Sequence, residues 1–73
     1  MMTVKYQTAG EELLDRTLDA CIRALTEEPL PRMEAISRVR NEMGADFATT
    51  EQYMLKLVEE GLVSFKDEKY SLR

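Results

Sequence analysis

Apolar residues recur at helical spacing in three stretches of the chain, and at alternate positions near its end. In the first stretch they stand three or four residues apart: Leu14, Leu18, Cys21, Ile22 and Leu25. Thr8 precedes Glu11 by three residues, as in a helix N-terminal capping box. The pattern predicts a helix over residues 9–27 that ends before Pro29. Residues 3–7 alternate polar and apolar, and we interpret residues 1–7 as an arm or short strand.

The second stretch follows a segment that contains two prolines. A residue before a proline is disfavoured in helical geometry, so Leu30 is expected to be extended. Pro31 is suited to open a helix, where its missing N–H costs nothing. Gly44 is a natural stop in a left-handed conformation. We predict a second helix over residues 32–43, with one apolar stripe formed by Met33, Ile36, Val39 and Met43.

The third stretch predicts a helix over residues 50–60. Thr49 is its expected N-cap, with Gln52 as the partner in a capping box. Gly61 is expected to close it in a left-handed conformation. Phe47 is expected to pack beneath the preceding turn. The apolar side of this helix is formed at 100° per residue by Thr50, Tyr53, Met54, Leu57 and Val58.

After Gly61 the period of the pattern changes from 3.6 to 2, which is typical of strands. The polar sequence KDEK separates two short alternating runs, so we predict a β-hairpin in which Phe65 faces Tyr70 and Val63 faces Leu72. A lone hairpin is unstable in water, so its apolar face must lie on the helices. These elements predict an α+β fold, mainly α, with residues 8–73 as a single domain.

The sequence YMLKLVEEGLVSF resembles the end of a winged helix-turn-helix domain. In that superfamily the third helix runs through Leu-x-x-x-Gly-Leu-Ile/Val into a β-hairpin wing, and here these positions are Leu57, Gly61, Leu62 and Val63. The resemblance implies three helices plus a C-terminal wing, with Leu62 turned into the core. The order of the predicted helices and strands matches that of the superfamily over nearly the whole chain.

Many members of this superfamily bind DNA through the outward face of the third helix and through the wing. The resemblance therefore implies a small DNA-binding protein, most simply a transcriptional regulator, whose partner is double-stranded DNA. Base-facing candidates are Thr49, Glu51, Gln52, Leu55 and Lys56. Phosphate-facing candidates are Lys66, Lys69 and Arg38.

Charge weakens this interpretation. The net charge is −4, and no third of the chain is strongly basic, although a basic surface is the usual mark of a DNA-binding domain. The third helix also carries acids and an outward apolar residue. The alternative is an acidic winged-helix module that binds a protein, as a subunit, adaptor or small inhibitor, possible contacts being Leu55, Glu51 and Glu59.

The composition favours a binding protein over an enzyme. The chain has no histidine and one cysteine, and shows no phosphate-binding loop or nucleophile motif, so we expect no catalytic residues, metal or cofactor. Cys21 lies on an apolar helix face and is expected to be a plain buried thiol. No apolar run is long enough to span a membrane and no secretory signal is visible, so we expect a cytoplasmic protein. A homodimer through the first helix is expected, because one small domain buries little surface on DNA.

Overall fold

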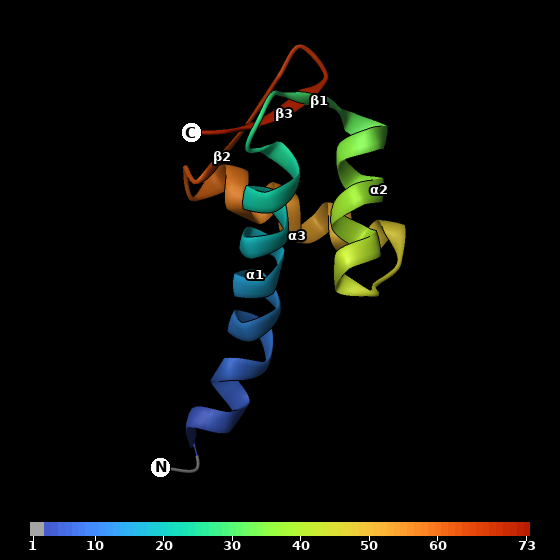
Figure 1. The fold of residues 1–73 in the computed structure, drawn as a ribbon. Coiled ribbons are helices and arrows are strands. Elements are labelled where there is room, and N and C mark those ends of the chain that lie inside the picture. Colours follow the sequence, from blue (N-terminus) through green and yellow to red (C-terminus); the bar gives the residue numbers. More distant parts are fainter. Residues whose placement is uncertain (1–2) are drawn as a thin grey trace.

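The computed structural model describes the backbone of residues 3–73 and the side chains of residues 12–73. Three helices are followed by an antiparallel hairpin, which is an α+β fold, mainly α (Figure 1). The elements in chain order are α1 (Thr3–Leu25), β1 (Leu30–Pro31), α2 (Arg32–Met43), α3 (Phe47–Glu59), β2 (Val63–Lys66) and β3 (Lys69–Leu72). The three helices pack on one another, and the small sheet lies across one end of them.

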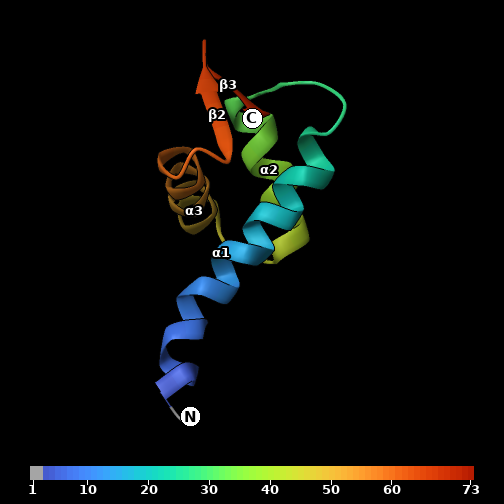
Figure 2. The ribbon, with the colours of Figure 1, turned by 90° about the vertical axis from the view of Figure 1, so that its left-hand side faces the viewer.

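Helix α1 is longer at its N-terminal end than predicted. Its backbone is helical from Thr3, so the prediction of a short strand is wrong for residues 3–7, and residues 1–2 lie outside the described part. Thr8 is inside the helix and does not begin it. Five alternating residues are too few to separate strand from helix, and each residue that extends an existing helix adds a backbone hydrogen bond. The N-terminal part of α1 extends away from the other elements (Figure 2).

Helix α2 has the predicted bounds. It begins immediately after Pro31 and ends at Met43, and Gly44 follows in the left-handed conformation with φ 72°. The Gly44 N–H donates to the Arg40 carbonyl at 2.8 Å, which satisfies one of the carbonyls left open at the helix end. The proline before this helix and the glycine after it were sufficient to predict where the helix begins and ends.

Helix α3 begins three residues earlier than predicted. Its N-cap is Asp46, whose side chain accepts a hydrogen bond from the Thr49 N–H at 2.7 Å, so Thr49 is not the cap. Asp46 competes well for this role because an acid is among the best N-caps and also favours the positive end of the helix dipole. The turn between α2 and α3 is therefore only residues 44–46. Phe47 opens α3 and packs against the core, as predicted.

The end of α3 has the predicted glycine stop. Gly61 is left-handed, with φ 80°, and its N–H donates to the Val58 carbonyl at 3.0 Å. The Leu62 N–H donates to the Leu57 carbonyl at 3.0 Å, which completes a Schellman motif. The prediction that Leu62 turns into the core is wrong, because its side chain is 44% exposed and Val63 is the residue that enters the core.

The hairpin register is the predicted one, with Phe65 opposite Tyr70 and Val63 opposite Leu72. The rings of Phe65 and Tyr70 are in contact, with centroids 4.6 Å apart. The sequence did not reveal that the sheet has a third strand. Leu30, expected only to be extended, pairs with Tyr70 in β1, which gives the strand order β1-β3-β2.

The core lies where the helices meet the inner face of the sheet. Each helix contributes buried residues to it, and the sheet contributes three; together they are Ala20, Cys21, Leu25, Leu30, Ala35, Ile36, Val39, Met54, Leu57, Val63 and Tyr70. All of those from α1 lie in its C-terminal half. Three helices with a small three-stranded antiparallel sheet form a layout compatible with a winged helix.

Candidate nucleic-acid interface

The outward face of α3 is defined by the burial of the opposite face. Thr50, Met54 and Leu57 are buried, so at 100° per residue the side chains near positions 52 and 59 point away from the core. Gln52 and Lys56 are exposed, and Thr49 is half-buried beside them. The structure therefore brings three of the five predicted base-facing candidates, Thr49, Gln52 and Lys56, onto one exposed side of α3, with Glu59 at its C-terminal end.

Glu51 is not a free acid on this face. The Arg32 Nε donates to Glu51 Oε2 at 2.9 Å, and the Arg32 Nη2 donates to the same oxygen. The Glu51 carboxylate raises the pKa of Arg32 through these hydrogen bonds and the opposite charge. Arg32 is the first residue of α2, so this ion pair crosses from one helix to the next and compensates the charge of Glu51.

The two wing lysines lie side by side. Lys66 and Lys69 are direct cross-strand partners next to the turn, and both are exposed. Like charges placed opposite each other in a sheet are destabilising, and the turn between these two lysines carries the exposed acids Asp67 and Glu68. Together with Ser64, Ser71 and Asp67, the two lysines line a shallow hollow of about 280 Å³.

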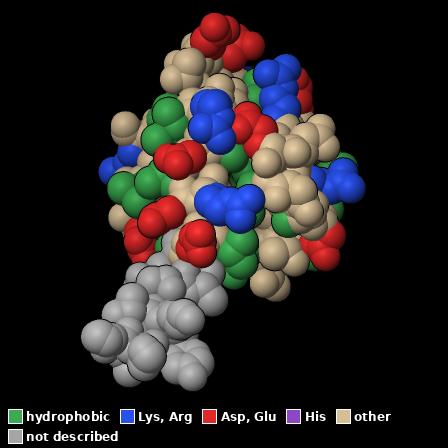
Figure 3. Space-filling view, turned by 60° about the horizontal axis from the view of Figure 1, so that its bottom comes forward, with side chains coloured by type: hydrophobic (Ala, Val, Ile, Leu, Met, Phe, Trp, Pro, Cys, Tyr) green, Lys and Arg blue, Asp and Glu red, His purple; other side chains and the backbone are tan. Residues whose placement is uncertain are grey.

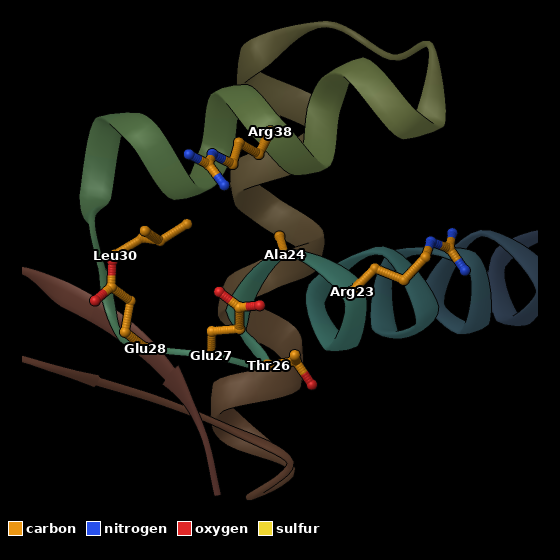
Figure 4. A pocket seen from close by; sticks show the side chains of 7 residues that line it. All are labelled: Arg23, Ala24, Thr26, Glu27, Glu28, Leu30 and Arg38. Carbon is orange, nitrogen blue, oxygen red and sulfur yellow. The ribbon is translucent and has the colours of Figure 1, made fainter.

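Arg38 lies apart from these residues. It is paired with Glu34 at 2.9 Å, one helical turn away on α2. Its guanidinium points into a hollow between α2 and the segment that joins α1 to β1 (Figure 4). This hollow of about 220 Å³ is lined by two arginines and two glutamates, and no residue of α3 or the wing lines it; the lining residues are Arg23, Ala24, Thr26, Glu27, Glu28, Leu30 and Arg38. The geometry gives Arg38 no part in a surface formed by α3 and the wing.

Two exposed apolar side chains are close in sequence to the members of the Arg32–Glu51 pair. Met33 is 61% exposed, and its sulfur accepts a weak contact from Arg32 Nη1 at 3.8 Å. Leu55 is 43% exposed and follows Glu51 by one helical turn. These two residues are the apolar part of the surface that the alternative, protein-binding interpretation requires.

The charges elsewhere on the molecule are mixed. Figure 3 shows one face on which Lys and Arg side chains are interspersed with Asp and Glu. Any attraction for an anionic partner must therefore come from a local cluster of cations and not from the total charge of −4. The wing lysines are an adjacent pair of cations, with the exposed acids Asp67 and Glu68 in the turn between them.

Cys21 does not belong to a reactive site. Its side chain is fully buried in the core, and burial raises the pKa of its thiol to about 12. A thiol with this pKa stays protonated at neutral pH and is a poor nucleophile. The prediction of a plain buried thiol is confirmed.

No protein-family model, curated protein or solved structure matches this sequence. The layout and the candidate surface must therefore be judged on the chain's own residues. Within residues 3–73, no helix combines the length and apolar character that crossing a membrane requires.

Sequence reasoning missed two residues that shape the candidate surface. Asp46 sets the start of α3, and its place three residues before Thr49 was a usable signal. Arg32 pairs with Glu51 across 19 positions of the chain, and no local pattern indicates such a partner.

Proposed function

We propose that this protein binds double-stranded DNA through the outward face of α3 and the wing, as a small transcriptional regulator of the winged-helix type. The observation that carries the proposal is the N-terminal part of that face. From Ala48 to Lys56 it presents Gln52 and Lys56, and the one acid in this range, Glu51, is paired with Arg32. Glu59, the last residue of α3, and Glu60, its C-cap, have no such partner among the described side chains.

The proposed contacts follow from the chemistry of each side chain. Gln52 can pair with the N6 and N7 atoms of adenine, and Lys56 can donate to guanine or to a phosphate. Thr49, near the start of α3, can donate its hydroxyl to a base edge or phosphate. The wing residues Lys66 and Lys69 supply two adjacent cations for the DNA backbone, and backbone contacts account for most non-specific affinity.

Fluorescence anisotropy of a labelled random-sequence duplex tests this proposal. We expect binding at low salt that weakens linearly with the logarithm of salt concentration, because bound phosphates release counterions. The double variant K66Q/K69Q should lower the slope of this dependence by about two contacts. The matched control R16Q/R40Q removes two exposed charges outside α3 and the wing, and should leave the slope nearly unchanged. A wild-type protein that does not bind at low salt would exclude the proposed function.

A protein-docking function is the second candidate. It is favoured by the exposure of Met33, which follows Arg32, and of Leu55, one helical turn after Glu51, since interface centres are often apolar. In this case Leu55, Glu51 and Glu59 would contact the partner, and the wing lysines would be dispensable. Pull-down with the wild type, L55E and K66Q/K69Q distinguishes the candidates. A partner lost only with L55E, together with no duplex binding, supports docking.

The proposal also includes a homodimer formed through α1, and a cytoplasmic location, where a regulator of this kind meets DNA. Specific DNA sites are commonly bound by dimers whose symmetry matches two half-sites. A second copy would double the number of phosphate contacts available to a chain with so few exposed cations.

A further inference from the structure

We infer that Arg32 is a positioning residue that fixes the tip of the wing relative to α3. The inference deepens the proposed function, on which its consequence for DNA binding rests. Arg32 itself is not required to touch DNA. It joins α3 to the turn of the wing, in addition to the direct connection of α3 to β2 at the base of the hairpin.

Arg32 makes contacts in two directions. Its side chain binds Glu51 on α3, with Nε to Oε2 at 2.9 Å. Its backbone N–H donates to the Glu68 carbonyl at 3.0 Å, and Glu68 is in the turn of the wing. Pro31, the preceding residue, pairs with Lys69 at the start of β3. One residue therefore links α3 to the hairpin turn.

Besides the packing of Val63 and Tyr70 in the core, polar contacts join the hairpin to α3 at its base and near its tip. At its base, the Schellman motif around Gly61 joins α3 directly to β2. At its tip, the Glu68 carbonyl accepts a hydrogen bond from the Arg32 N–H, next to the pairing of Pro31 with Lys69. Because Lys66 and Lys69 flank this turn, the link sets the position of both lysines relative to Gln52.

The Arg32–Glu51 pair is also the least exposed of the ion pairs among the described side chains. Its side chains are 37% and 25% exposed, against 62% and 36% for Arg23–Glu42. The attraction within a less exposed pair is less screened by salt. Forming such a pair also costs less side-chain conformational entropy. Arg23–Glu42 is a matched control, because it also joins two helices but lies away from α3 and the wing.

Amide hydrogen exchange of the free protein, followed by NMR, tests the link without any DNA. R32Q and E51Q should each speed exchange at position 32 and in the wing turn by about two- to fivefold, the size of effect expected of a partly exposed ion pair. The control variants R23Q and E42Q, which change the net charge by the same amounts, should leave these amides unchanged. R32K keeps the charge but loses the forked contact, and should behave more like R32Q than like wild type.

The inference is overturned if the wing amides of E51Q exchange as in wild type, or if R23Q and E42Q speed them equally. Duplex titration then measures the consequence. K69Q should cost less affinity in the R32K background than in wild type, because a displaced wing no longer holds Lys69 in place. Equal costs in both backgrounds would contradict a positioning role. If the exchange results hold but wild type binds no duplex, the link stands and the proposed DNA function fails.

Discussion

Tyr70 is the largest fully buried side chain of the described core, and its hydroxyl has no hydrogen-bond partner among the described residues. Burial also raises the pKa of this phenol, so it stays neutral. A buried unpaired hydroxyl carries a desolvation cost of about 1–3 kcal/mol. We expect Y70F to match or exceed the wild type in unfolding free energy, by about 1 kcal/mol in chemical denaturation. A clear loss of stability would mean that the hydroxyl is bonded in solution.

Glu68 is held in the left-handed region, with φ 62°, next to Asp67 with φ 54°. Two consecutive left-handed residues form the tight hairpin turn that favours Asn-Gly or Asp-Gly. A side chain at this conformation costs about 1 kcal/mol or more, which glycine avoids. E68G should therefore raise the unfolding free energy by about 1 kcal/mol, and the urea midpoint would show it. The control E60G removes the same side chain from a right-handed position and should destabilise α3.

At the scale of elements, the start of α3 depends on Asp46. The Thr49 N–H donates to its carboxylate and holds the pKa of Asp46 below its ordinary value. A lowered folded-state pKa adds stability above the unfolded pKa of about 4, and this is lost as pH falls through the folded value. D46A should lower the urea midpoint at pH 7, with a smaller difference from wild type at pH 2–3.

Two further variants test whether Asp46 or Thr49, the residue expected from the sequence, is the N-cap of α3. D46N keeps a good capping group but cannot titrate, so its stability should vary less than that of wild type between pH 4 and pH 2. T49A keeps the backbone N–H that donates to the Asp46 carboxylate. It should therefore lower the unfolding free energy less than D46A does. A larger loss of unfolding free energy in T49A than in D46A would identify Thr49 as the N-cap.

At the scale of the whole molecule, α1 carries the proposed dimer surface. Ile22 is 44% exposed and continues, at four-residue spacing, the partly buried Leu14 and Leu18. If a second copy covers this stripe, I22E should convert the dimer to a monomer with little loss of helicity, because Ile22 is outside the core. Light scattering after size-exclusion chromatography measures the mass. A wild-type monomer at high concentration would exclude the dimer.

The candidate site was only partly predictable. Periodicity placed Gln52 and Lys56 on the exposed side of α3, and alternation placed Lys66 and Lys69 beside the wing turn. These predictions succeeded because the direction of a side chain within one element depends on the local period. Arg38 looked similar to the other cations in sequence, but it points into a different hollow (Figure 4).

The sequence by itself determined the features that depend on neighbours a few residues away. These include the bounds of α2, the left-handed glycines and the register of the hairpin, since each is set by local sterics and hydrogen bonds. Tertiary structure decided the rest. Leu30 became a strand because Tyr70 was there to pair with it. The charge of Glu51 is compensated because folding brought Arg32, 19 positions away, within hydrogen-bond distance of its carboxylate. Such pairings depend on the approach of distant segments, which no local pattern encodes.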